Sequence, residues 1–364
     1  MSIALRVPSY IRAISPYVPG KPITELARQM GIAVEKIVKL ASNENPRGMS
    51  PKARKAVEAA LAGAERYPDQ FDLIAALAER HGVAAEQVVL GNGSNDVLDM
   101  AARVFLAPGR SAVFSQHAFA VYPLATMSAG AECIVAPARH YGHDPAAMFA
   151  AIRPDTHLVW IANPNNPTGN FLPQAELRAF IEKIPPHVAV VLDEAYTEYL
   201  APVDRADTVA WIGDIPNLIV TRTFSKIYGL AGLRVGYGVA RAEVADLLNR
   251  VRQPFNVNNL ALAGALAALD DHVFVADSFD LNRRGMEQIV AGLKRLGLDH
   301  IPSHGNFVTI AVADGAAVNH KLLQQGVIVR PIGGYGLPNH LRVTIGLEAE
   351  NLRFLEALDK ALRA

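Results

Sequence analysis

The stretch LIVTRTFSKIYGLAGLR, residues 218–234, indicates the fold and the chemistry of this chain. Its first five residues form an apolar run that predicts a buried strand, and Lys226 follows with hydroxyl residues before it and glycines after it. A lysine at this place suits an amine held as a Schiff base to an aldehyde cofactor. Thr223, Ser225 and Arg234 would then bind a phosphate of that cofactor. Taken alone, Lys226 could also be a solvated loop lysine.

Two upstream segments place further polar side chains directly after apolar runs. Asn166 lies in the segment NPNNPTG, 163–169, which follows the run 158–162, whereas Asp193 and Tyr196 follow the run 188–192. Ligands of open α/β sheets bind outside the carboxyl ends of the strands, so these side chains are expected to meet Lys226. Asp193 would keep a cofactor ring nitrogen protonated, with Asn166 and Tyr196 donating to a ring oxygen. A helix N-cap is the alternative for Asp193.

Alternation of strands and helices predicts an α/β fold. Short apolar strands are expected at 88–90, 112–115, 133–136, 158–162, 188–192, 218–221 and 235–239. Helices are expected at 51–63, near 72–81, and between most of the strands, for example at 95–105 and 174–183. This pattern is typical of a mostly parallel sheet that helices cover on both faces. The sequence therefore predicts a large cofactor-binding domain over 46–245.

The two ends of the chain differ from this pattern. Residues 1–45 contain four prolines that break any long helix, so we expect an irregular N-terminal arm. After Arg241, alanine- and leucine-rich helical patterns continue to about residue 297. Strands are then expected near 306–312, 327–330 and 341–345, with a terminal helix from about 348. We therefore expect a smaller α+β domain over 246–364.

Composition narrows the class of protein. Apolar residues make up 51% of the 364 positions and charged residues 19%, which favours a folded chain with a sizeable core. The 35 basic and 35 acidic residues balance, so charge gives no reason to expect nucleic acid or a membrane surface as a partner. The one cysteine, Cys133, allows no intrachain disulfide. No signal peptide or spanning segment is visible, and we expect a cytoplasmic protein without a metal site.

Further candidate residues lie in four other segments. The segment LGNGSND, 90–96, follows one strand and opens a helix, so Ser94 and Asn95 are candidates for a phosphate cradle, with a plain tight turn as the alternative. An aromatic ring often covers a cofactor, and Phe119 is favoured over Tyr122 for that role. Arg330 and Arg342 adjoin apolar strands and call for anionic partners, either a substrate or an internal salt bridge.

Together these residues resemble the pyridoxal-phosphate-dependent aminotransferases of fold type I, which share the aspartate aminotransferase fold. Within the class-II subgroup they resemble the histidinol-phosphate aminotransferases over nearly the whole chain. The segments that carry the resemblance are 16–21 (PYVPGK), 39–46 (KLASNENP), 66–69 (RYPD), 91–95, 163–169, 193–196, 223–234 and 329–331. Departures are small: the phosphate loop contains Ser94-Asn95 where an acidic residue often follows, and Phe119 stands where many relatives have tyrosine.

The resemblance implies a role for each matching residue. Lys226 would carry pyridoxal 5'-phosphate as an imine, with Asp193 and Tyr196 as its catalytic neighbours. The cofactor would be held by Ser94, Asn95, Phe119, Asn166, Asp193, Tyr196, Thr223, Ser225, Lys226 and Arg234. Tyr67 would reach the cofactor phosphate of a neighbouring subunit, which implies a homodimer with shared active sites. The substrate's phosphate or carboxylates would be bound by Tyr17, Asn43, Arg330 and Arg342.

The reaction expected from this resemblance is a step of histidine biosynthesis. L-Histidinol phosphate and 2-oxoglutarate would give imidazole-acetol phosphate and L-glutamate, in a ping-pong sequence through the imine of Lys226. An aromatic amino acid aminotransferase is the first alternative, and a decarboxylase on the same scaffold is a more distant one. A non-enzymatic binding module is the alternative from another class; such a module is expected to lose Lys226, Asp193 or Arg234, and all three are present.

Overall fold

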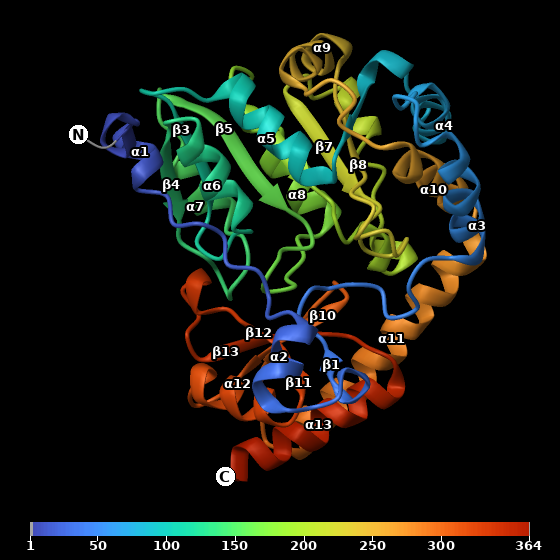
Figure 1. Ribbon diagram of the computed structural model, residues 1–364. Coiled ribbons are helices and arrows are strands. Elements are labelled where there is room, and N and C mark those ends of the chain that lie inside the picture. The colour runs from blue at the N-terminus through green and yellow to red at the C-terminus, as the bar shows by residue number, and fades with distance from the viewer. Residues whose placement is uncertain (1–2, 364) are drawn as a thin grey trace.

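The computed structural model describes residues 3–363, and within them a seven-stranded sheet forms the centre of a large lobe (Figure 1). Its strand order is β2-β8-β7-β6-β5-β3-β4, and the five strands from β7 to β4 run parallel. Among the described strands of this sheet, only β8 runs in the direction opposite to the others, antiparallel to both β2 and β7. The strands are β2 (Val88–Gly91), β3 (Ser111–Ser115), β4 (Glu132–Ala136), β5 (Thr156–Ala162), β6 (Ala189–Asp193), β7 (Leu218–Thr223) and β8 (Gly236–Val239). The mostly parallel sheet predicted from the sequence is confirmed.

Helices cover both faces of this sheet. Successive residues of a strand point to opposite faces, so Trp160 packs on one side of β5 and Ile161 on the other. One face packs against α5 (Ser94–Phe105), α6 (Val121–Ser128) and α9 (Ala242–Val251). The other face packs against α3 (Pro51–Ala60), α4 (Phe71–His81), α7 (Pro145–Ala150), α8 (Gln174–Ile181) and α10 (Asn259–Leu269). Because both faces are buried, the strands are continuous apolar runs.

A small lobe lies below the large one in Figure 1 and has its own core. Its antiparallel sheet has the order β12-β13-β10-β9 and packs against three helices. These elements are β9 (His300–Ile301), β10 (Phe307–Ala311), β12 (Arg330–Pro331), β13 (His340–Thr344), α11 (His272–Arg295), α12 (Gly315–Gln324) and α13 (Glu348–Arg363). A parallel pair joins β1 (Val38–Lys39) to β11 (Val327–Ile328) beside it.

The N-terminal segment is more ordered than expected. Besides α1 (Ser9–Arg12), it contains α2 (Ile23–Met30) and β1. Leu26 of α2 is fully buried in a cluster with Ile37, Ala41 and Ile328, so residues 23–41 pack on the small lobe. The expectation of an irregular arm over 1–45 is therefore wrong for this part. The prolines precede α2 rather than interrupt it, because Pro22 is its N-cap.

The expected boundary at residue 245 also differs from the observed packing. Leu248 of α9 and Ala265 of α10 are buried in the two cores of the large lobe. The chain changes lobe along α11, the long helix at the right of Figure 1. Phe279 on this helix packs in the large lobe, whereas Ile289 belongs to the core of the small lobe. The start of the alanine- and leucine-rich helical pattern after Arg241 is therefore not the start of the small lobe.

The helices within residues 3–363 do not have the character of single membrane spans. None of the single helices there is long and apolar enough to cross a membrane. Helices α10 and α11 pass the length and composition test only as a pair, and an 81° bend separates them.

Candidate active site

A cavity of about 320 Å³ lies where the carboxyl ends of β5, β6 and β7 face the small lobe. Its walls come from the large lobe, from the segment 41–44 and from the small lobe. All but one of the predicted site residues line it: Tyr17, Asn43, Ser94, Asn95, Phe119, Asn166, Asp193, Tyr196, Thr223, Ser225, Lys226, Arg234, Arg330 and Arg342. Asn166, Asp193, Tyr196 and Lys226, the four residues to which the strand-end argument applied, lie together at the same edge of the large sheet.

Asp193 is the last residue of β6 and is buried at the base of the cavity. Two hydroxyl groups donate to its carboxylate: Tyr122 Oη lies 2.9 Å from Oδ2, and Thr221 Oγ1 lies 3.2 Å from Oδ1. Burial raises the pKa of Asp193 to about 6, although the two donors and the Lys226 charge oppose this shift. The carboxylate is thus ionised at neutral pH and can hold a cationic ligand atom.

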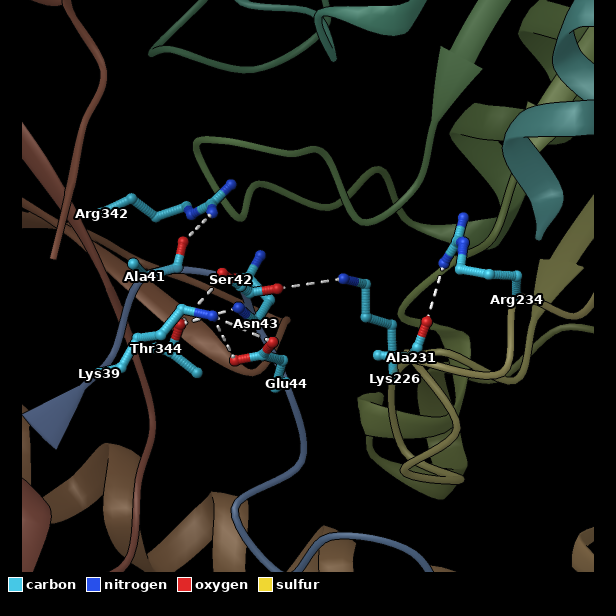
Figure 2. Close-up of polar contacts among 10 residues, drawn as sticks. All are labelled: Lys39, Ala41, Ser42, Asn43, Glu44, Lys226, Ala231, Arg234, Arg342 and Thr344. Atoms are coloured by element: carbon cyan, nitrogen blue, oxygen red, sulfur yellow. Dashed lines mark hydrogen bonds and ion pairs between the residues drawn. The ribbon is translucent and has the colours of Figure 1, made fainter. Parts of the chain in front are cut away.

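Lys226 follows β7 and extends toward the segment 41–44 (Figure 2). Its Nζ donates to the Ser42 carbonyl oxygen over 3.4 Å and lies 5.7 Å from the centre of the Tyr196 ring. Burial lowers the pKa of Lys226 to about 8, and the nearby Arg342 charge contributes to the shift. A much larger share of this amine is neutral near pH 7 than for an ordinary lysine, whose pKa is about 10.4. It can therefore act as a nucleophile or as a base.

One end of the cavity has the chemistry of an anion site. Helix α5 begins there with Ser94, and the amide groups of a helix N-terminus favour negative charge. Arg234 Nη1 lies 3.5 Å from Ser225 Oγ. The same atom donates to the Ala231 carbonyl oxygen at 3.0 Å (Figure 2). Gly93 has a φ of +80°, and a Cβ atom at this position would lie 2.6 Å from Arg234 Nη2. Glycine at 93 thus leaves room for the guanidinium.

Two arginines of the small lobe bound the opposite side of the cavity. Arg342 on β13 is buried, and it donates to Asn166 Oδ1 at 2.6 Å and to the Ala41 carbonyl oxygen at 2.7 Å. Its Nε is buried without a hydrogen-bond partner in the described part of the chain. Arg330 donates to the Val18 carbonyl oxygen at 2.8 Å, and its Cζ lies 5.4 Å from the centre of the Tyr17 ring.

The internal salt bridge considered for these arginines is not observed. Within residues 3–363, neither Arg330 nor Arg342 has a carboxylate within ion-pair distance. A buried guanidinium without a counter-charge is costly, which favours an anionic ligand at Arg342. Arg330 is half-buried and is likewise free to pair with an anion.

Tyr67 is the predicted site residue that does not reach this cavity. It is 79% exposed and stacks on Phe255, with 4.4 Å between the ring centres. Its expected role therefore requires a cavity other than that of its own chain.

The two aromatic residues considered for stacking on a cofactor, Phe119 and Tyr122, differ in whether they line the cavity. Phe119 lines the cavity, whereas Tyr122 is fully buried behind it and contacts Phe119 edge to face at 5.8 Å. Sequence reasoning named Tyr122 only as a stacking candidate and missed its hydrogen bond to Asp193. Ser42 was missed as well, because it contributes a backbone carbonyl that no side-chain pattern reveals. Other lining residues that were not predicted include Gly20, Glu44 and Tyr335.

Comparison with known proteins shows the family of this chain. The family described as "Aminotransferase class I and II" matches residues 35–358. A relative named histidinol-phosphate aminotransferase 1, from Dechloromonas aromatica, is 76% identical over 362 residues, with all of both chains covered. The chain belongs to the class I and II aminotransferases, among the histidinol-phosphate aminotransferases.

Solved structures agree with this aminotransferase assignment. The histidinol-phosphate aminotransferase from Sinorhizobium meliloti, in complex with pyridoxal-5'-phosphate, superposes with a TM-score of 0.91 at 28% identity and 98% coverage of both chains. The fold also matches the aspartate aminotransferase from Thermus thermophilus with maleate, at a TM-score of 0.85, 22% identity, and coverage of 98% of this chain and 99% of that one. The aspartate aminotransferase fold predicted from the sequence is confirmed.

Proposed function

We propose that this aminotransferase uses pyridoxal 5'-phosphate to transfer the amino group of L-histidinol phosphate to 2-oxoglutarate. The products are imidazole-acetol phosphate and L-glutamate, formed in a ping-pong sequence. The observation that carries the proposal is one cavity that combines an amine of lowered pKa, Lys226, with an ionised carboxylate, Asp193. Two guanidinium groups that have no carboxylate partner within residues 3–363, Arg330 and Arg342, line the same cavity. The relatives' names supply the substrate.

The residues present fit this cofactor. Its phosphate suits the end of the cavity where Ser94 starts α5 and where Ser225 and Arg234 lie together, a donor set that Gly93 leaves open. Asp193 suits the ring nitrogen, because a buried carboxylate favours the protonated form of that atom. The other holders are Asn95, Phe119, Asn166, Tyr196 and Thr223, all of which line the cavity.

When bound, pyridoxal phosphate supplies an aldehyde for the amino group and a protonated ring that accepts the electron pair left at the substrate's Cα. Asp193 holds the proton at the ring nitrogen. Lys226 Nζ would hold the aldehyde carbon when no substrate is bound and, once free, would move the proton at the substrate's Cα. Tyr196 and Asn166 orient the ring oxygen. The Tyr196 hydroxyl is itself positioned by Asn43 Nδ2 at 2.9 Å.

Two kinds of anion must be accepted in turn at the small-lobe side. A guanidinium pairs with either a carboxylate or a phosphate in a forked geometry. We assign the substrate phosphate to Arg330 and Tyr17, which lie together, and assign Arg342 to both substrates. Asn43 adjoins the same space and hydrogen-bonds to Thr344 beside Arg342. These assignments predict that the preference for a phosphorylated substrate depends on Arg330.

Measured turnover tests both the substrate and this assignment. With 2-oxoglutarate in excess, the purified protein is expected to turn over histidinol phosphate faster than phenylalanine. Loss of a charged hydrogen-bond partner in Arg330→Ala is expected to lower kcat/KM for histidinol phosphate by roughly one to two decades, with a smaller effect on phenylalanine. If the unmodified protein turns over phenylalanine faster, the proposed substrate is wrong and the protein is an aromatic amino acid aminotransferase. The rings of Tyr17, Phe119 and Tyr335 in the cavity wall would suit an aromatic substrate.

We also propose that the enzyme works as a homodimer in the cytoplasm. Tyr67 is exposed on its own subunit, and a second subunit would give this phenol a cofactor phosphate to bind. The single cysteine, Cys133, is compatible with a reducing compartment.

A further inference from the structure

A chain of buried contacts fixes the carboxylate of Asp193 from the side away from the cavity. Tyr122 on α6 donates its hydroxyl to Oδ2 at 2.9 Å. The Tyr122 ring stacks on Trp160 with 5.2 Å between centres and 3° between planes. Trp160 in turn donates Nε1–H to Thr126 Oγ1 at 3.1 Å, one helical turn beyond Tyr122. Both aromatic rings are fully buried, so the phenol has little freedom to turn away from Asp193.

We propose that Tyr122 is a positioning residue that keeps Asp193 ionised and oriented toward the ring nitrogen of the cofactor. The inference concerns Asp193 itself and rests on the proposed function only for the part that involves the cofactor. Tyr122 does not line the cavity and acts through Asp193.

The surroundings of Asp193 explain why a donor is needed there. Burial destabilises its charged form, and the adjacent carboxylate of Glu194 acts in the same direction. Lys226 opposes these effects, as does Thr221 through its 3.2 Å bond to Oδ1. The Tyr196 phenol also faces Asp193. Tyr122 supplies the donor to the second oxygen. Burial raises the pKa of Tyr122 well above its usual value, so the phenol stays protonated and donates to a carboxylate that can only accept.

Removing the Tyr122 hydroxyl is expected to raise the pKa of Asp193. A carboxylate without the hydroxyl holds a proton more tightly, because hydrogen bonds to the charged form favour that form. In the enzyme with its cofactor, the proton shared between Asp193 and the ring nitrogen then shifts toward the carboxylate. The ring becomes a weaker electron acceptor, so removal of the Cα proton slows while cofactor binding through Lys226 and Arg234 persists.

The test compares Tyr122→Phe with Tyr237→Phe. The first substitution keeps the ring on Trp160 and removes one hydroxyl, whereas Tyr237→Phe removes a buried hydroxyl that pairs with His81 at 2.9 Å outside the cavity. In holoenzyme loaded with ¹⁵N-labelled pyridoxal phosphate, the ring-nitrogen NMR signal at neutral pH is expected to move toward the unprotonated position only in Tyr122→Phe. In cofactor-free protein, the midpoint of the Asp193 carboxyl ¹³C titration is expected to lie near pH 6 in the unmodified chain. In Tyr122→Phe this midpoint is expected to be higher by about one to two pH units.

The outcomes separate the two proposals. An unmodified protein that binds no pyridoxal phosphate contradicts the proposed function, yet the carboxyl titration still tests Tyr122. Unchanged ¹⁵N and ¹³C signals in a folded Tyr122→Phe protein overturn the inference. If Tyr122→Phe does not fold, site-specific replacement of Tyr122 by 3-fluorotyrosine takes its place. This stronger donor is expected to lower the Asp193 midpoint, and an unchanged or higher midpoint rejects the positioning role.

Discussion

Two effects of opposite sign act on the amine of Lys226, and their balance is a property of single residues. Burial and the Arg342 and Arg234 charges favour the neutral form, whereas Glu44 and Asp193 favour the charged form. The first group prevails, and the pKa falls to about 8. The cavity thus prepares a nucleophile before any ligand arrives.

This balance predicts a pH dependence for chemical labelling of Lys226. Only the neutral amine reacts with an acylating reagent, so labelling in cofactor-free protein is expected to rise with pH and to reach half its maximum near pH 8. Mass spectrometry of digested samples measures the labelled fraction at each pH. Exposed Lys183 serves as an internal comparison in the same digests. A midpoint for Lys226 near 10.4, the value for an unperturbed lysine, would contradict the burial argument.

At the residue scale, the sequence predicted those site members that follow apolar strand ends. Lys226, Asp193 and Asn166 come directly after such runs, and the parallel sheet brings their positions together. The Tyr122–Asp193 bond could not be predicted, because it depends on the angle at which α6 packs against β5 and β6. The link from Arg342 to Ala41 depends on long-range packing of the N-terminal segment and carries no local signal.

At the scale of elements, Gly93, the N-cap of α5, lies so close to Arg234 that a side chain there would displace the guanidinium. Gly93→Ala is expected to weaken pyridoxal phosphate binding, because the added methyl group displaces the guanidinium. Gly109→Ala is a matched control: Gly109 has a φ of +88° and nothing within 4 Å of an added Cβ. Both substitutions are expected to lower the free energy of unfolding by about 1–3 kcal/mol through backbone strain. Fluorescence titration with the cofactor distinguishes them, and equal affinities would reject the displacement argument.

A second prediction concerns the junction of β6 and β7. Arg222 on β7 pairs with Glu194, directly after β6, at 2.9 Å, and these side chains are 15% and 5% exposed. Arg222→Met would leave a buried carboxylate uncompensated, so the free energy of unfolding is expected to fall by about 3–5 kcal/mol. Urea denaturation measures this loss. The double variant Arg222→Met/Glu194→Leu is expected to recover most of it, and a double variant as unstable as the single one would show that the ion pair is not the cause.

Element prediction succeeded where the periodic signal was local. The apolar strands of the large lobe were predicted to within one or two residues, and the helix over 348–363 began where expected. The expected strand 327–330 is instead two short strands, because the chain leaves β1 at Ile328 and joins β13 at Arg330. Strand β1 itself has two residues and owes its existence to β11, so no local pattern could indicate it.

At the scale of the whole molecule, the exposed position of Tyr67 predicts active sites shared between two subunits. Sedimentation is expected to show a dimer. Lys226→Ala and Tyr67→Ala proteins, refolded together in equal amounts, are expected to regain about a quarter of the unmodified activity, because half of the dimers are hybrids with one intact site. The matched control mixes Lys226→Ala with Asp193→Asn. Both of these side chains line the cavity of their own chain, so every site in a hybrid dimer has one defect and no activity is expected to return. If the Tyr67→Ala mixture gains no activity over its separate components, Tyr67 serves its own chain or no site.

The pairing of β1 with β11 joins the beginning of the chain to a segment close to its end, and this has a consequence for synthesis on the ribosome. Chain synthesis adds about 5–20 residues per second, so Val327 is made on the order of 15 to 60 s after its pairing partner Val38. During that interval the large lobe can already pack, because its strands lie within residues 88–239. The segment 41–44, which contributes the Ser42 carbonyl opposite Lys226, has no small lobe to hold it until then. A nascent chain therefore acquires its core early and its complete active site only in the last moments of translation.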